Sequence, residues 1–207
     1  MHALGHSPVT YFHCGEYVAA ETRSKEVVVL AGEKGTSFWE AWGMMNQGCV
    51  SALTGRSSDA INIISSGIDA WRSTGARALM PMYLTYLAKA YANDRQFGEA
   101  RHCIDQAVTA VDTTNETWFE AEVSRSAGEI ALKSPEPDAA KAQSYFERAL
   151  AVARQQQAKS WELRAAMSLA RLWRDQGKVQ QARELLASVR TTEINRKAGQ
   201  SIFGRGA

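Results

Sequence analysis

The stretch from 83 to 107 alternates small and large apolar residues at a spacing that suits two helices packed closely against each other. Its members are three alanines and four large residues: Ala88, Ala100, Ala107, Leu84, Leu87, Tyr91 and Ile104. Small residues let antiparallel helix backbones approach, and the large side chains then fill the seam between them. Asn93, Asp94 and Gly98 suit the turn that connects the two helices. The stretch therefore predicts a helix pair that is built for stacking.

The same small-and-large pairing recurs along the chain at intervals of about 40 residues. The pair that Ala88 and Ile104 form has three counterparts: Gly48 with Ile64, Gly128 with Phe146, and Ala170 with Leu186. A helix pair repeated at a regular interval is typical of tetratricopeptide-like arrays, in which each pair buries its apolar face against the next. We therefore predict an all-α, tetratricopeptide-like, right-handed helical-repeat solenoid of about four to five helix pairs.

This spacing divides the chain into a repeat array with less regular ends. We expect four tetratricopeptide-like repeats: 37–76, 77–116, 117–159 and 160–190. A degenerate N-terminal helix pair over 1–36 precedes them, and an irregular C-terminal tail over 191–207 follows. The third repeat is longer than its neighbours because two additional residues fall around Pro135 and Pro137.

Local signals near the N-terminus predict where its helices begin. Ser7 followed by Pro8 predicts a helix from Pro8 to about Glu21. A serine hydroxyl can cap the exposed amides at a helix start, and proline suits the first helical position because the N–H that it lacks would have no partner there. The β-branched run over 27–30 favours a strand by propensity alone. We predict helix there, because the later segments are helical and context outranks local propensity.

Two helix starts in the repeat array carry the pattern of a capping box. Ser37 with Glu40, and Thr117 with Glu120, place a hydroxyl three residues before a carboxylate. In such a box each side chain satisfies a backbone donor that the helix start leaves free. We therefore expect helices to begin at both positions.

The composition is that of a soluble globular protein. Of 207 residues, 45% are apolar and 22% charged, and the formal net charge is +2 with acidic and basic residues interspersed. Binding to a nucleic-acid backbone requires a basic stripe, and a membrane-spanning helix requires about 20 apolar residues in a row. The sequence has neither, so we expect no nucleic-acid partner and no membrane insertion.

The cysteine pattern and the N-terminal sequence predict a cytoplasmic location. Cys14, Cys49 and Cys103 are odd in number and widely spaced, unlike a disulfide framework or a metal-binding pair. The first 20 residues lack the basic leader and the unbroken apolar run of a secretory signal. The thiols are therefore expected to be reduced core or groove residues.

The motifs that could indicate catalysis, a cofactor or a metal are all incomplete. Residues 32–37 contain glycine, lysine, threonine and serine, but not in the order of a phosphate-binding loop, so we interpret them as a helix end and a helix start. His2, His6 and His13 have no ligand cluster beside them apart from the single Cys14. We expect no catalytic residue, no cofactor, no metal and no enzymatic activity in this chain.

The repeat spacing also predicts which side chains line the concave face of the array. These candidate binding residues are Trp42, Met45, Cys49, Thr85, Lys89, Asn93, Glu122, Arg125, Glu129, Arg164, Met167, Arg171 and Arg174. This predicted binding line is apolar at its N-terminal end and rich in arginine at its C-terminal end. Arginines one helical turn apart can hold carboxylates bidentately. An acidic peptide segment is therefore a candidate partner. The alternative is that the last arginines pair with Glu162 and Asp175 on a solvated face.

Three segments of the sequence indicate a particular protein family more specifically than the repeat spacing does. They are AWRSTGA over 70–76, WFEAE over 118–122, and AKSWELRAAMSLARLWRDQGK over 158–178. They resemble the C-terminal tetratricopeptide region of large bacterial regulators that join an adenylate cyclase or winged-helix module to a signalling ATPase. The resemblance implies a sensor or protein-interaction arm that regulates an attached nucleotide-dependent module. Any cyclase or ATPase activity would then reside outside this chain.

Together these observations predict a non-catalytic protein-interaction or ligand-sensing repeat domain of a bacterial signalling regulator. Its partner would be a protein or peptide, or a neighbouring domain of the same regulator. Two other classes stay open: an enzyme on a helical scaffold with an unrecognised site, and a helical-repeat RNA binder. Glu122 and Glu129 on the predicted groove, together with the small net charge, favour the protein-interaction class over the RNA binder.

Overall fold

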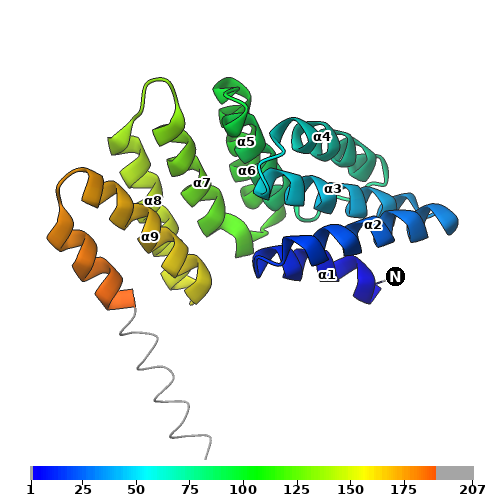
Figure 1. The fold of residues 1–207 in the computed structure, drawn as a ribbon, viewed down its shortest axis with the longest axis horizontal. Helices are drawn as coiled ribbons and strands as arrows, with labels where there is room; N and C mark the ends of the chain where they lie inside the picture. The colour runs from blue at the N-terminus through cyan, green and yellow to red at the C-terminus, as the bar shows by residue number, and fades with distance from the viewer. Residues whose placement is uncertain (1, 190–207) are drawn as a thin grey trace, which may run out of the picture. The chain divides into compact units, whose positions relative to one another are not determined.

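The computed structural model describes residues 2–189, and these form helices joined by turns and short loops (Figure 1). The helices are α1 (His2–His13), α2 (Tyr17–Glu33), α3 (Ser37–Leu53), α4 (Ser57–Ser73), α5 (Met80–Asn93), α6 (Phe97–Thr114), the 3₁₀ helix η1 (Thr117–Phe119), α7 (Glu120–Lys133), α8 (Ala139–Gln155) and α9 (Lys159–Asp175). A further helical segment, 179–189, follows α9. The described part of the chain contains no β-strand, so the all-α prediction is confirmed there.

The chain divides into two compact units. Unit 1 is Met1–Thr117 and contains α1 to α6, and unit 2 is Trp118–Ala207 and contains α7 to α9 with the segment 179–189. Within each unit, helices that follow one another pack together, and α3 also contacts α5 as α7 contacts α9. Each unit is thus a stack of antiparallel helix pairs.

The helix bounds can be compared with the predicted intervals. The interval 37–76 contains α3 and α4, 77–116 contains α5 and α6, and 1–36 contains α1 and α2. Helix α9 begins one residue before the expected start of the last repeat. The tail predicted over 191–207 lies outside the described residues.

The close approach of paired helices depends on the small residues that the sequence pattern singled out. A Cβ atom added to Gly48 would lie 2.4 Å from the Ile64 side chain, and one added to Gly128 would lie 2.5 Å from the ring of Phe146. Ala88 of α5 is likewise completely buried. Gly48 and Gly128 therefore provide the space that a large residue of the partner helix occupies, as expected for close-packed interiors.

The turn inside the helix pairs repeats one backbone conformation. Gly55 follows α3 with a φ of 83°, and Arg95 adopts a φ of 63° at the matching place after α5. Glycine enters this left-handed region without a steric penalty, whereas arginine does so at a cost of about 1 kcal/mol. The turn therefore keeps its conformation at a position where glycine is replaced by arginine.

The predicted start of the first helix is wrong. Helix α1 begins at His2, includes Pro8 and ends at His13, before the turn at Gly15. Proline cannot donate to the carbonyl of Leu4, but the hydroxyl of Ser7 donates to that carbonyl at 2.8 Å. The serine thus satisfies a backbone acceptor inside the helix instead of capping a helix start.

The two predicted capping boxes also differ from the structure. Ser37 is already the first residue of α3, and the preceding Thr36 makes no side-chain capping bond. Thr117 begins the 3₁₀ helix η1, which shifts the start of α7 to Glu120. The helical prediction for 27–30 is confirmed, because α2 runs through these residues.

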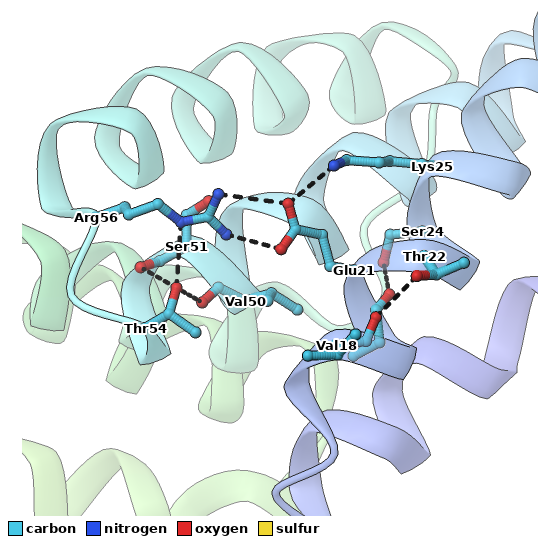
Figure 2. A network of polar contacts seen from close by, with 10 residues as sticks. Val18, Glu21, Thr22, Ser24, Lys25, Val50, Ser51, Thr54 and Arg56 are labelled. Atoms are coloured by element: carbon cyan, nitrogen blue, oxygen red, sulfur yellow. Dashed lines mark hydrogen bonds and ion pairs between the residues drawn. The ribbon is translucent and has the colours of Figure 1, made fainter.

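A polar network joins α2 to the turn between α3 and α4 (Figure 2). Arg56 in the turn lies 3.1 Å from the carboxylate of Glu21, and Lys25 lies 3.0 Å from the same group. The guanidinium of Arg56 also donates to Thr54, whose hydroxyl donates to the carbonyl of Val50. Hydrogen bonds from Lys25 and Arg56 lower the pKa of Glu21.

We expect Ala149→Glu to destabilise unit 2, because Ala149 is completely buried in the core beside Phe146. A carboxylate there would lie in an apolar layer without a partner, at a cost of about 3 kcal/mol or more. Urea unfolding followed by circular dichroism measures the loss. Ala151→Glu on the exposed side of the same helix is the control, with an expected change below about 0.5 kcal/mol. Equal unfolding midpoints for the two variants would show that the packing assignment is wrong.

Candidate functional site

The apolar end of the predicted binding line lies inside unit 1. Met45 and Cys49 of α3 are completely buried and Trp42 is 4% exposed. Thr85 of α5 is also buried, and its hydroxyl donates to the carbonyl of Pro81 at 2.6 Å. Burial raises the pKa of the Cys49 thiol. These four side chains belong to the core instead of lining an open groove, which differs from the expectation.

Helix α1 covers Trp42 and also contacts α5. The indole nitrogen of Trp42 donates to the carbonyl of Gly5 at 2.7 Å, and the ring of Phe12 meets the ring of Tyr86 edge-on at 5.6 Å. A Cβ atom added to Gly5 would lie 2.3 Å from the ring of Trp39, so the two helices are in close contact. A helix running from residue 8 to residue 21 would not have placed Gly5 there.

The next two predicted residues, at the far end of α5, are more accessible. Lys89 is half-buried, and its ammonium lies 5.1 Å from the centre of the Tyr86 ring, where it is attracted to the ring face. Asn93 is the last residue of α5 and is exposed.

In unit 2, three predicted groove residues pair with one another. The guanidinium of Arg125 donates to both carboxylate oxygens of Glu122 at 2.7 Å and also contacts Glu129. A further bond of 3.2 Å reaches the hydroxyl of Ser168 and so joins α7 to α9. Burial alone would lower the pKa of Arg125, but the two carboxylates raise it well above its usual value. This cluster is a cross-link between α7 and α9, in which the charge of Arg125 is already paired.

Arg164 and Glu162 both take part in ion pairs, as the alternative interpretation of the sequence expected, but with other partners than each other. Arg164 lies 3.9 Å from Glu122, and its guanidinium stands 5.2 Å from the ring centre of Trp161. Glu162 is buried and pairs with Lys159 at 2.6 Å and Arg154 at 3.1 Å. Burial raises the pKa of Glu162, but the hydrogen bonds from Lys159 and Arg154 outweigh it and lower the pKa overall.

The remaining predicted residues line a cleft between α9 and the segment 179–189. This arginine cleft has a volume of about 340 Å³ and is lined by Met167, Ala170, Arg171, Arg174, Val179, Ala182, Arg183 and Leu186. Three of its apolar side chains are partly open to solvent: Met167 is 37% exposed, Val179 41% and Leu186 39%. Arg174 pairs with the adjacent Asp175 at 2.8 Å. Within residues 2–189, Arg171 and Arg183 have no ion-pair partner.

Sequence reasoning missed Arg183, Val179 and Leu186 as site residues. Val179 is at position i of the helical segment, Arg183 at i+4 and Leu186 at i+7, and this spacing alone places them on one face. The predicted concave face, however, contains residues from only the first helix of each pair.

The described residues form no cluster that could hold a metal ion. No group of three or more His, Cys, Asp or Glu side chains between residues 2 and 189 could hold a metal ion. The rings of His2 and His6 instead pack edge-on against Trp39 and Trp42, at 4.9 Å and 5.0 Å. None of the described helices is long and apolar enough to cross a membrane.

Comparison with known proteins places this fold among tetratricopeptide-like repeat structures. No known protein family and no curated protein matches the sequence. Among solved structures, a Rap protein complexed with the competence and sporulation factor matches with a TM-score of 0.78 and 14% identity. The match covers 88% of this chain and 50% of the Rap chain, so this chain spans half the length of that relative.

Two further structures give the same result. A Podosopora anserina protein with nearly identical kinesin-light-chain TPR-like repeats matches with a TM-score of 0.63 and 16% identity, over 95% of this chain and 96% of its own. BtubC (BKLC) from P. vanneervenii matches with a TM-score of 0.67 and 16% identity, over 92% of this chain and 78% of its own. The predicted all-α, tetratricopeptide-like helical-repeat fold is therefore confirmed.

We expect Arg125→Leu to destabilise unit 2 by about 3–5 kcal/mol, because it leaves the buried carboxylate of Glu122 without its main partner. Urea unfolding measures the change. The matched control is Arg174→Leu, which removes an exposed pair and is expected to cost less than about 1 kcal/mol. Replacing Glu122 and Arg125 together by leucine should recover much of the loss. Similar unfolding midpoints for the two single variants would contradict a stabilising role for the buried pair.

The lowered pKa of Glu162 predicts a contribution to stability that depends on pH. The contribution is fully present above the ordinary carboxyl value of 4.5 and is lost as the pH falls through the lower, folded-state pKa. Glu162→Gln removes the titrating group. The difference in unfolding free energy between the parent and this variant should therefore be largest near neutral pH and shrink below about pH 4.5. Urea unfolding over a pH series tests this, and a constant difference would contradict it.

Proposed function

We propose that this chain is a non-catalytic, tetratricopeptide-like protein-interaction domain whose unit 2 binds an acidic peptide segment. The observation that carries the proposal is the arginine cleft, in which three guanidinium groups surround partly exposed apolar side chains. The similarity to a Rap protein complexed with the competence and sporulation factor supports a binding role for this fold.

The charges of the cleft favour a carboxylate-bearing partner. Arg171 and Arg183 have no ion-pair partner within residues 2–189, and the pair between Arg174 and Asp175 is exposed and therefore easily exchanged. A guanidinium binds a carboxylate through two parallel hydrogen bonds, which gives both strength and orientation. Two or three Asp or Glu residues of a peptide would match this arrangement.

The apolar side chains of the cleft favour a partner that also carries large apolar residues. Met167, Val179 and Leu186 expose more than a third of their surface although they lie beside the core of unit 2. Covering such surface contributes about 25 cal/mol per Å², and methionine adapts well to different partners. The expected ligand is thus a short segment that combines acidic and apolar side chains.

The C-terminal tail of this chain has the wrong charge to be that ligand. Between residues 190 and 207 one acidic residue, Glu193, stands against four basic ones: Arg190, Arg196, Lys197 and Arg205. A basic segment is repelled by an arginine-lined cleft. The occupant is therefore expected to be a separate acidic segment, from another protein or from a neighbouring domain.

The resemblance over 158–178 supports a more specific role as the regulatory arm of a cyclase- or ATPase-type bacterial regulator in the cytoplasm. In that role the domain would couple binding of its partner to a nucleotide-dependent module. The coding sequence upstream of Met1 tests this part: a cyclase or ATPase module encoded in frame would support it, and an unrelated reading frame would contradict it.

Selection from a random twelve-residue peptide display library tests the binding proposal. We expect enriched peptides to be net acidic and to contain at least two large apolar residues. Arg171→Glu combined with Arg183→Glu should weaken binding of a synthetic enriched peptide by at least about tenfold in fluorescence polarisation, since a hydrogen bond to a charged group contributes about 1.5–3 kcal/mol.

Lys141→Glu provides the matched control, because this residue is exposed on α8 outside the cleft. It makes a charge change of the same sign in unit 2 and should leave the affinity unchanged. Enrichment of basic peptides, or equal affinity of the cleft variant and the control, would contradict the proposal. Salt-sensitive binding of single-stranded RNA through the same arginines would do so as well, in favour of an RNA binder.

A further inference from the structure

Unit 1 contains a larger cavity that the proposed function does not use. It has a volume of about 670 Å³, within the usual range for small-molecule sites, and lies between the end of α4, the loop that follows it, the start of α5 and one face of α6. All its lining residues belong to unit 1. It is therefore separate from the arginine cleft of unit 2.

One end of this cavity is positively charged. Arg72 comes from the last turn of α4, and Arg77 comes from the loop after it. Both side chains are exposed, and neither has an ion-pair partner in the described part of the chain. Arg72 also complements the carbonyl end of α4, but a helix end carries only about half a unit of negative charge. The two guanidinium groups therefore leave this end of the cavity with a net positive charge.

The rest of the wall is a mixture of hydroxyl, amide and apolar groups. Thr109 and Thr113 line the cavity from α6, and His102 and Gln106 of the same helix are hydrogen-bonded to each other at 2.7 Å. These positions are one turn apart and share a face of the helix. Apolar surface comes from Met80 and Leu84 of α5.

The loop that carries Arg77 is held in place by side-chain hydrogen bonds. The indole of the buried Trp71 donates to the carbonyl of Ala78 at 3.2 Å, and the backbone N–H of Leu79 donates to the carboxylate of Glu116 at 2.7 Å. Leu79 has a φ of 62°, an unusual conformation for a bulky residue. Such backbone conformations persist only where the surroundings impose them, so the wall of the cavity is preformed.

We propose that this cavity binds a small organic anion. Its carboxylate or phosphate group lies between Arg72 and Arg77, and its uncharged body lies along α6 over Met80 and Leu84. Asp105 lines the cavity on α6 and disfavours a second negative group at that end. The ligand therefore carries its negative charge at one end only.

Isothermal titration calorimetry with three defined probes tests the proposal: 4-phenylbutanoate, phenyl phosphate and the uncharged 4-phenylbutanol. We expect at least one of the two anions to bind with a dissociation constant of roughly 1 mM or tighter, and the alcohol at least about tenfold more weakly. The anion that binds distinguishes a carboxylate site from a phosphate site. Absence of binding by both anions up to about 10 mM would overturn the proposal.

Two variants locate the site independently. Arg77→Glu reverses the charge at the anion end, and Thr109→Trp fills the cavity from an exposed position of α6 without a change in charge. Both should reduce the affinity at least about tenfold, and a thermal melt checks that each variant is folded. The control is Arg101→Glu, an exposed residue of α6 outside the cavity, which should leave binding unchanged.

The experiment also separates this site from the arginine cleft. Arg171→Glu in unit 2 should leave binding of the anion unchanged. Loss of binding in this variant, or full affinity in both Arg77→Glu and Thr109→Trp, would overturn the assignment to unit 1.

Discussion

The stacking of helix pairs depends on the contact between a small residue of one helix and a large residue of its partner. Gly48 leaves room for Ile64, and Gly128 leaves room for the ring of Phe146. Because protein interiors are close-packed, such contacts determine how near two helix axes lie and how the next helix can be added.

The two units use the same repeat position in different ways. Trp42 and Glu122 lie two repeat intervals apart, and both are buried. Unit 1 fills the position with an aromatic ring under α1, whereas unit 2 fills it with a carboxylate that Arg125 neutralises. A buried charge is tolerated only with a well-placed partner, so the ion pair constrains the relative position of the two side chains more strictly than apolar packing does.

The repeat spacing was sufficient to predict the helix pairs and the contacts of Gly48 with Ile64 and of Gly128 with Phe146, because these are local patterns with a regular period. It failed for Leu186, which is 39% exposed instead of filling the space beside Ala170. The helix ends were less predictable, since a serine before a proline can cap a helix or satisfy a carbonyl inside one, as Ser7 does. The burial of Trp42 could not be inferred, because it depends on contact with Gly5, which is distant in sequence. At the arginine cleft the sequence predicted Arg171 but not Arg183. Arg183 lies on the second helix of its pair, and the predicted binding face included only the first.

The cover that α1 provides in unit 1 has a thermodynamic consequence for binding. A helix connected to α2 by a short turn is present at a high effective concentration, on the order of millimolar or more for a short connection. Any external segment that approached the face of Trp42 would have to displace this tethered helix and break the bond from the indole to Gly5. Its apparent affinity would be the intrinsic affinity multiplied by the fraction of molecules in which α1 has left this face. The chain thus carries a tethered helix that would compete with any external segment for the face of Trp42.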